Sequence, residues 1–200
     1  MREPLQKIIE TEISSNALVV TCGLPVTCKT PIAEIIAKAK GQRIIRTDLL
    51  RKEVLKDSDI FDEKVASDIE NRMAVYSEAL RRADEILNQG YGVVIDATFV
   101  TQSLRLQAAA LANTYGRTFV ILQTHCSREV SLQRIKKRTR EDYESNALTE
   151  QAYTCNENMF EKVDLDDIKR LYPNLDIVHL IVDTQYDMPG NWYVISIEKR

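Results

Sequence analysis

Histidine, cysteine and glycine are all scarce in this chain of 200 residues, with counts of two, four and six. The cysteines are Cys22, Cys28, Cys126 and Cys155, and no two of them form a CxxC pair. A structural zinc site needs four cysteine or histidine ligands at short spacings, so the sequence argues against one. The cysteines indicate free thiols in a reducing compartment, with a disulfide as the less favoured alternative.

Long apolar runs are also missing, and neither sign of charge dominates. No run approaches the roughly 20 residues that span a bilayer, and residues 1–13 contain no apolar signal core. The formal net charge of −3 does not favour a general nucleic-acid or membrane-surface binder. We therefore expect a cytoplasmic protein without a membrane partner. The length and the hydrophobic content of 44% suit a single domain.

Short β-rich runs alternate with longer helical runs along the chain. Strand character marks 17–22, 43–46, 92–97, 118–124 and 177–182. Helical periodicity marks 5–13, 31–40, 65–87, 103–115 and 127–138. Strands separated by helices predict parallel βαβ units, and hence an α/β three-layer sandwich with a mostly parallel sheet.

Helix caps and the C-terminal region add local detail to this prediction. Ser103 and Ser127 are candidate N-caps of the two later helices. Residues 192–197 alternate like a strand after a turn at 189–191, and we expect them to form an edge strand.

The segment 23–30, GLPVTCKT, directly follows the first strand and precedes a helix. This is the context of a phosphate-binding loop, in which backbone N–H groups hold phosphate oxygens. The residues that would contact a nucleoside triphosphate are Gly23, Leu24, Pro25, Val26, Thr27, Cys28, Lys29 and Thr30. Lys29 would reach the β- and γ-phosphates, and Thr30 would place its hydroxyl on Mg²⁺. The alternative is a strand-to-helix turn with an exposed lysine.

Two residues of this phosphate loop, as we call residues 23–30, depart from the glycine-rich signature. Cys28 replaces a glycine of the signature, and Val26 is a second non-glycine residue. Glycine adopts backbone angles that other residues resist, and a strained non-glycine residue costs about 1–3 kcal/mol. Because Cys28 adjoins a helix N-terminus and Lys29, we expect it to ionise more readily than a free cysteine. Alternatively the loop is relaxed, with a negative φ at Cys28 and a buried sulfur.

Charged residues follow the next two strands, at the strand ends where parallel sheets bind ligands. Asp48 and Arg51 share one side of a helix start, so Asp48 could accept a hydroxyl proton and Arg51 could hold a phosphate. The alternative for Asp48 is an ordinary N-cap. Asp96 ends a buried strand and suits metal or water coordination, although a simple turn residue is equally compatible.

A basic run at 134–140 ends the helix that follows the fourth strand. Arg134 and Arg138 lie one turn apart and could close over phosphates. Favourable charge at a helix C-terminus accounts for the run equally well. A nucleic-acid patch is the least favoured interpretation, because no aromatic residues interleave with the charges.

The order of these motifs resembles the P-loop kinase-like ATPases known as predicted kinases. Their relatives include polynucleotide 5′-kinases, zeta-toxin-like kinases and chloramphenicol phosphotransferases. GLPVTCKT is similar to their phosphate loop GLPGSGKS/T, RTDLLRKEV and VVIDATF to their second and third strand motifs, and RIKKRTR to their lid. The resemblance covers 17–183. It implies one domain over 1–200, with its core at 17–183, a lid at about 134–150 and an appendage at 187–200.

The resemblance also implies ATP and Mg²⁺ as cofactors and a hydroxyl-bearing acceptor. The residues implied in catalysis are Lys29, Asp48 as the base, Arg51 near the acceptor or transferred phosphate, and Arg138 from the lid. Those implied in nucleotide, metal or acceptor binding are the phosphate loop, Thr30, Asp96, Thr98 and Arg134. The predicted function is ATP-dependent phosphotransfer to a hydroxyl of a small molecule, nucleoside or nucleic-acid end. The rival prediction is a non-catalytic nucleotide-binding or regulatory protein with an impaired phosphate loop.

Overall fold

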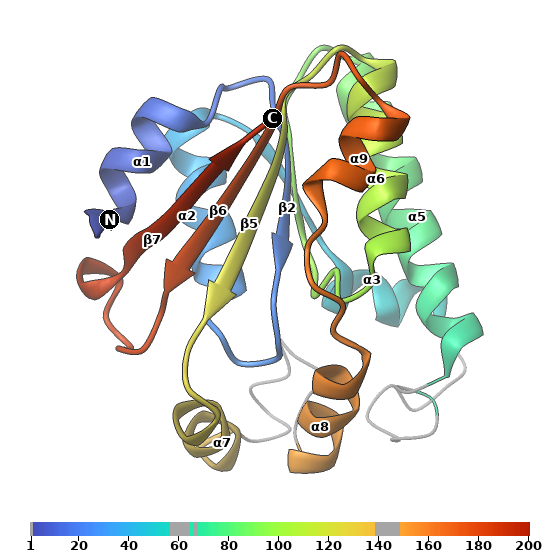
Figure 1. The fold of residues 1–200 in the computed structure, drawn as a ribbon. Coiled ribbons are helices and arrows are strands. Elements are labelled where there is room, and N and C mark those ends of the chain that lie inside the picture. Colours follow the sequence, from blue (N-terminus) through green and yellow to red (C-terminus); the bar gives the residue numbers. More distant parts are fainter. Residues whose placement is uncertain (1, 57–64, 66–67, 139–148) are drawn as a thin grey trace.

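The computed structural model describes residues 2–56, 65, 68–138 and 149–200. Its centre is a seven-stranded sheet with the order β1-β7-β6-β5-β2-β4-β3 (Figure 1). The strands are β1 Glu3–Pro4, β2 Leu18–Cys22, β3 Arg43–Arg46, β4 Val93–Asp96, β5 Phe119–His125, β6 Ile177–Asp183 and β7 Tyr193–Lys199. Strands β3, β4, β2, β5 and β6 are parallel, and β7 runs antiparallel to both of its neighbours.

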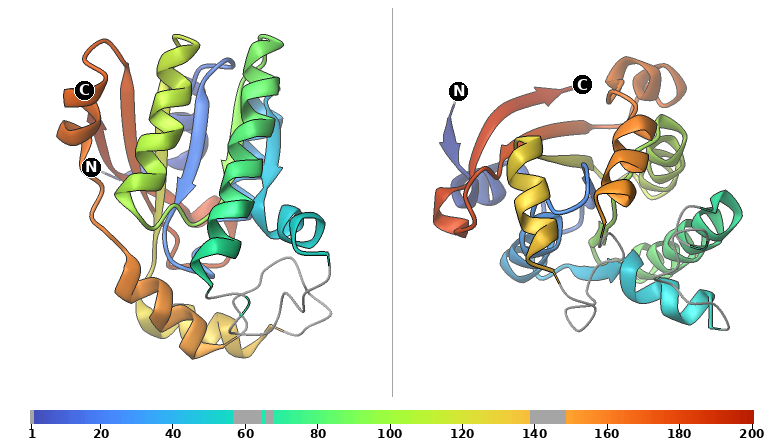
Figure 2. Two further views of the ribbon diagram at one scale, coloured as in Figure 1. Left: turned by 90° about the vertical axis from the view of Figure 1, so that its right-hand side faces the viewer. Right: turned by 90° about the horizontal axis from the view of Figure 1, so that it is seen from below.

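Helices cover both faces of the sheet, which confirms the predicted α/β three-layer sandwich. They are α1 Leu5–Glu12, α2 Lys29–Lys40, α3 Thr47–Val54, α5 Ile69–Asn88, α6 Gln102–Thr114, α7 Arg128–Lys136, α8 Glu150–Met159 and α9 Leu165–Leu171. Helices α1 and α2 lie on one face, and α5, α6 and α9 lie on the other. Helices α7 and α8 lie beyond the carboxyl ends of the parallel strands (Figures 1 and 2).

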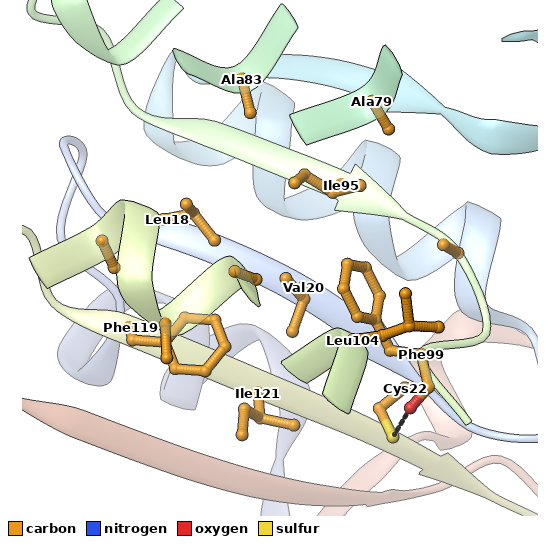
Figure 3. Packing of buried hydrophobic residues seen from close by; sticks show 14 of the residues in the cluster. Leu18, Val20, Cys22, Ala79, Ala83, Ile95, Phe99, Leu104, Phe119 and Ile121 are labelled. Atoms are coloured by element: carbon orange, nitrogen blue, oxygen red, sulfur yellow. Dashed lines mark hydrogen bonds between the residues drawn. The ribbon is translucent and has the colours of Figure 1, made fainter. Parts of the chain in front are cut away.

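Strand β2 shows why the central strands are continuous apolar runs rather than alternating ones. Leu18, Val20 and Cys22 pack against the α5–α6 face (Figure 3). Val19, between them, packs against the α1–α2 face. Because both faces are covered, every residue of the strand is buried, as expected for a parallel sheet.

Local hydrogen bonds set where the helices begin. Ser127 caps α7 as predicted, accepting from the backbone N–H of Val130. The predicted cap at Ser103 is wrong, because Thr101 accepts from the N–H of Leu104 and α6 starts before Ser103. Helix α2 starts before Pro31, since a proline in the first turn removes no intrahelical hydrogen bond. Helix α7 ends at Lys136, two residues before the predicted end.

The C-terminal strand is more central than predicted. Strand β7 pairs with β6 on one side and with β1 on the other, so the short β1 forms the edge. The turn before β7 is the 3₁₀ helix Pro189–Asn191. The adjoining Trp192 is only 2% exposed, and its indole N–H donates to the carbonyl of Tyr186 (2.7 Å).

Two predicted segments lie partly outside the described residues, and the described helices can be compared with the length of a membrane span. Of the predicted helix at 65–87, the described part is mainly α5. Most of the predicted lid at 134–150 lies outside the described residues, which include only its ends. Among the residues described, no helix combines the length and apolarity needed to cross a bilayer.

Candidate functional site

The phosphate loop leaves the carboxyl end of β2 and leads into α2. Gly23 begins it with a φ of +134°, and its N–H donates to the carbonyl of Thr98 (3.0 Å). A Cβ atom at Gly23 would lie 2.7 Å from the carbonyl oxygen of Thr124. Only glycine therefore fits here, on grounds of both space and backbone angle.

Val26 and Cys28 both adopt left-handed backbone angles, with φ values of 59° and 61°. Cys28 is the N-cap residue of α2. The relaxed-loop alternative, with a negative φ at Cys28, is therefore wrong. The chain keeps a backbone that suits glycine, using two residues for which left-handed angles cost about 1–2 kcal/mol each.

Packing and hydrogen bonds hold the loop in this conformation. The side chain of Val26 is only 7% exposed and forms a small apolar cluster with Ile135 of α7 and Tyr153 of α8. The hydroxyl of Thr27 lies 2.6 Å from that of Thr124 on β5. Interactions with three other elements thus offset the strain of the left-handed residues.

The guanidinium of Arg134, on α7, donates hydrogen bonds to the backbone of the phosphate loop and of the segment after β6. One guanidinium nitrogen, Nη1, donates to the carbonyl of Val26 (3.2 Å), and Nη2 donates to the carbonyl of Thr184 (2.7 Å). Nε donates to Asp187 Oδ1 (2.8 Å). The side chain of Arg134 is 12% exposed, so it links α7, the phosphate loop and the segment after β6.

Lys29, Thr30 and Asp96 lie at the junction of the phosphate loop, α2 and β4. Lys29 Nζ donates to the carbonyl of Leu24 (2.6 Å), so the side chain folds back over the loop. The hydroxyl of Thr30 donates to Asp96 Oδ2 (2.6 Å) across the gap between α2 and β4. The hydroxyl of Thr30, at the start of α2, and the carboxylate of Asp96, at the end of β4, are hard oxygen donors, the type that Mg²⁺ prefers.

Asp48 lies in the first turn of α3, which begins beside β4. The hydroxyl of Thr47 donates to the carbonyl of Asp96 (3.0 Å) and fixes the start of the helix there. Arg46 occupies the N-cap position, so Asp48 is not the N-cap. Arg46 and Asp96 are partners in the register of β3 and β4. Asp48, two residues after Arg46, therefore lies near Asp96 at the carboxyl ends of these strands.

The environment of Asp48 raises its pKa from the ordinary 3.8 to about 6. Burial is the largest cause, and the nearby charge of Asp96 adds to it. The opposing cations, in decreasing order of effect, are Arg51, Lys29 and Arg138. The structure thus places these predicted site residues near enough to Asp48 for their charges to act on its carboxylate.

The pKa values of two phosphate-loop residues, Lys29 and Cys28, are also shifted. Burial lowers the pKa of Lys29, while the carboxylates of Asp96 and Asp48 oppose that change. Burial raises the pKa of the Cys28 thiol, even though Arg134 lies near enough to favour the thiolate. The expectation that Cys28 ionises easily is therefore wrong, because desolvation outweighs the neighbouring positive charge.

Several polar residues around the site were not singled out from the sequence. The hydroxyl of Thr21 donates to the carbonyl of Ala97 (2.8 Å), and Arg46 Nε lies 3.9 Å from Asp96 Oδ2. The hydroxyl of Tyr76 lies 3.2 Å from that of Thr98 and accepts from the N–H of Phe99 (2.9 Å). The rule that strand ends share an edge would have found Arg46. Tyr76 belongs to an apolar stripe and gives no such signal.

Comparison with known proteins gives a family match over most of the chain and matches of fold to solved structures. A family model described as AAA domain matches residues 18–161. Uncharacterised proteins of Mycobacterium tuberculosis and Mycobacterium bovis are 30% identical over 135 residues, covering 62% of this chain. The matched region spans 26% of the length of those relatives.

Solved structures agree in fold at low identity. A sugar kinase of Janibacter sp. HTCC2649 gives a TM-score of 0.59 at 16% identity, covering 87% of this chain and 88% of its own. A gluconokinase of Sinorhizobium meliloti 1021 gives 0.56 at 19%, covering 87% and 86%. Kti12 of Chaetomium thermophilum, in complex with ADP-AlF3, gives 0.53 at 20%, covering 74% and 81%. These likenesses show the α/β fold of P-loop kinases.

Proposed function

We propose that this chain, which belongs to the AAA domain family and has the P-loop kinase fold, transfers phosphate from ATP to a hydroxyl acceptor. One observation carries the proposal. Asp48, a carboxylate with a pKa of about 6, lies beside Lys29 of the phosphate loop and beside Asp96, which holds Thr30. A base, a phosphate-binding lysine and a pair of oxygen donors for a metal are the groups that phosphoryl transfer requires.

The phosphate loop and the N-terminus of α2 would hold the triphosphate. Their backbone N–H groups and the helix dipole favour phosphate oxygens. Lys29 would exchange the carbonyl of Leu24 for the β- and γ-phosphates. Thr30 and Asp96 would hold Mg²⁺, which when bound neutralises charge on the phosphates.

Asp48 would act as the general base for the acceptor hydroxyl. A base is most effective when its pKa lies close to the working pH, and burial moves Asp48 in that direction. Arg138, which influences both Asp48 and Lys29, would neutralise charge that develops on the transferred phosphoryl group. The acceptor would be a small molecule, a nucleoside or a nucleic-acid end.

The rival function is nucleotide binding without catalysis. The non-glycine residues Val26 and Cys28 in the phosphate loop are the reason to consider this rival function. The left-handed angles of Val26 and Cys28 support the enzyme instead, because the backbone keeps the shape that glycine would give. The raised pKa of Asp48 also supports the enzyme, since binding alone does not need a base.

Nucleotide binding is tested by thermal unfolding with and without MgATP. A ligand at 100 times its dissociation constant should stabilise the fold by about 2.7 kcal/mol. Lys29→Ala should abolish the stabilisation, and the matched control Lys38→Ala, at an exposed position of the same helix, should retain it. Equal stabilisation of all three proteins, or none of the wild type, would contradict a nucleotide site at this loop.

Catalysis is tested by ADP release from MgATP across a panel of alcohols, nucleosides and oligonucleotide ends. Asp48→Asn should lower the rate about 10²- to 10⁴-fold and leave MgATP stabilisation in place. Because the base must be ionised, the wild-type rate should fall as the pH drops through about 6. MgATP binding with no acceptor-dependent ADP release from any member of the panel would favour the rival.

A further inference from the structure

Arg105, in the first turn of α6, is a cation with a side chain that is 0% exposed. Its Nε donates to the side-chain oxygen of Gln102 (2.9 Å), and its Nη1 donates to the carbonyl of Phe99 (2.7 Å). Its Nη2 donates to the carbonyls of Glu161 (2.9 Å) and Lys162 (3.1 Å). A buried cation is costly unless its donors are paired. These acceptors are neutral groups, so the guanidinium contributes a fixed geometry between the backbone segments that it joins.

The first of these segments is the β4–α6 loop, residues 97–101. Within it, the buried Phe99 has a φ of 40°, a backbone angle that bulky residues resist. Its N–H donates to the hydroxyl of Tyr76 (2.9 Å), and its carbonyl accepts from the thiol of Cys22 (3.5 Å, Figure 3). The hydrogen bond from Arg105 to the same carbonyl is the shortest of the three. Because a strained residue persists only where its surroundings fix it, Arg105 helps to set the shape of the loop.

Thr98, next to Phe99, connects the β4–α6 loop to the phosphate loop. Its carbonyl accepts from the N–H of Gly23 (3.0 Å), the first residue of the phosphate loop. Asp96, which accepts from the hydroxyl of Thr30, lies two residues before Thr98 at the end of β4. A shift of the β4–α6 loop would therefore disturb both the start of the phosphate loop and the carboxylate beside α2.

The second segment that Arg105 holds is residues 161–164, between α8 and α9. The N–H of Glu161 donates to the carbonyl of Val100 (2.8 Å), so this segment also contacts the β4–α6 loop directly. Gln102 Nε2 donates to the carbonyl at the end of the segment, that of residue 164 (2.7 Å). Arg105 and Gln102 together thus join the segment after α8 to the start of α6.

Helix α8, just before this segment, contacts the phosphate loop at another point. Tyr153 of α8 packs in one apolar cluster with Val26. The phosphate loop is therefore held on one side by the β4–α6 loop, at Gly23, and on the other side by α8, at Val26. Arg105 joins the two structures that hold it.

On the basis of the proposed function, we infer that Arg105 is a positioning residue for phosphoryl transfer. It fixes the β4–α6 loop relative to the end of α8, and through both it fixes the phosphate loop. Because its side chain is inaccessible, it contacts neither the nucleotide nor the acceptor. Its effect depends on the planar fork of donors, which reaches both backbone segments at once. A lysine keeps the charge but has a single nitrogen, so it cannot reproduce this geometry.

The Gly23 amide reports on the position of the phosphate loop without any ligand. Cys22–Gly23 is the only Cys-Gly pair in the sequence, so carbonyl-¹³C cysteine combined with ¹⁵N-glycine gives one signal in an HNCO spectrum of the full chain. Arg105→Lys should shift this signal and speed exchange of the amide with solvent about 10-fold. Leu87→Ala is the control, because Leu87 is buried in the last turn of α5, which leads to the amino end of β4. It should lower stability and leave the Gly23 signal unchanged.

Titration with MgADP tests whether this geometry matters for the nucleotide site. Arg105→Lys should bind MgADP about 10-fold more weakly than the wild type, and Leu87→Ala should bind as the wild type does. Gln102→Ala removes one acceptor of Arg105 and the link to residue 164, so it should show a smaller loss in the same direction. Wild-type affinity together with an unchanged Gly23 signal in Arg105→Lys would overturn the inference. If circular dichroism shows that Arg105→Lys is unfolded, the same two measurements on Gln102→Ala decide in its place.

Failure of the inference and failure of the proposed function give different results. If MgADP does not bind the wild type, the proposed function fails, and the Gly23 signal alone decides whether Arg105 positions the phosphate loop. If the ADP-release panel identifies an acceptor, Arg105→Lys should lower kcat about 10- to 100-fold. The KM for the acceptor should stay within about two-fold of the wild-type value, because the residue touches no substrate. A raised KM for the acceptor with an unchanged kcat would contradict a positioning role.

Discussion

Val26 and Cys28 have the same backbone conformation but different side-chain environments. Both adopt φ values near +60°. The valine side chain is buried against Ile135 and Tyr153, whereas the cysteine is half-buried at the start of α2. The strain is similar at the two positions, so the side-chain contacts decide what a glycine would do.

Glycine substitution should therefore have opposite effects at the two positions. Cys28→Gly should raise the free energy of unfolding by about 0.5–1 kcal/mol, because the strain relieved exceeds the added chain entropy. Val26→Gly should lower it by about 1–2 kcal/mol, because the lost burial exceeds the strain relieved. Urea unfolding of the two variants measures both changes. Shifts of the same sign would show that strain does not have the assumed size.

Asp48 should make stability depend on pH in a defined direction. Its pKa is 3.8 in the unfolded chain and about 6 in the fold, so between these values the folded state holds the proton and the unfolded state does not. Stability therefore falls as the pH rises from about 4 to about 6 and stays lower above it. Asp48→Asn removes this loss and should be more stable than the wild type at pH 7 by about 2–3 kcal/mol.

Urea unfolding at pH 4 and pH 7 measures this difference. The advantage of Asp48→Asn should be present at pH 7 and largely absent at pH 4, where the aspartate is protonated in the fold. An advantage of the same size at both pH values would mean that its origin is not the carboxylate charge.

Helix α7 contacts the phosphate loop directly. Arg134 donates to the carbonyls of Val26 and Thr184, and Ile135 packs against the Val26 side chain. The sequence suggested that Arg134 would act when phosphates are bound, whereas these contacts give it a part in the structure of the loop itself.

Arg134→Gln should accordingly destabilise the protein in the absence of nucleotide. Two buried carbonyls would lose their donors, at a cost of about 2–3 kcal/mol. The control is Arg128→Gln, on the same helix, where the side chain is exposed and its ion pairs with Glu150 and Glu157 should contribute little. Thermal unfolding compares the two. Unchanged stability of Arg134→Gln without nucleotide would show that the residue matters only when phosphates are bound.

The C-terminal segment, which the sequence suggested to be an appendage, supplies a strand of the sheet and part of the core. Strand β7 pairs along the length of β6, from Val178–Lys199 to Asp183–Tyr193. Trp192, just before β7, is buried with residues of α1, α2 and β6. The segment after β6 thus contributes to the core on the α1–α2 face.

Trp192→Ala should lower the free energy of unfolding by about 3–5 kcal/mol, the usual cost of removing a buried aromatic side chain. Met188→Ala, nearby but 68% exposed, should change it by less than about 0.5 kcal/mol. Denaturant unfolding followed by circular dichroism measures both variants. Similar small effects would mean that residues 187–200 are an appendage after all.

The sequence by itself determined the layers of the fold and the places where chemistry is to be sought. Short apolar runs that alternate with helical segments, such as β2, favour strands covered on both faces, and parallel strands end at one edge. That reasoning singled out Lys29, Asp48 and Asp96 from residues far apart in the chain, because local patterns set each strand end. It also gave the cap at Ser127, where the hydrogen bond spans only three residues.

Only the tertiary structure decided the state of each group in that site. The left-handed angles of Cys28 depend on contacts of the loop with β5, α7 and α8, which no local pattern encodes. The ionisation of Asp48 and Cys28 is set mainly by burial, and burial is a property of the packed molecule. Helix α3 packs on α5, a contact between segments that lie apart in the sequence, and no local pattern predicts it.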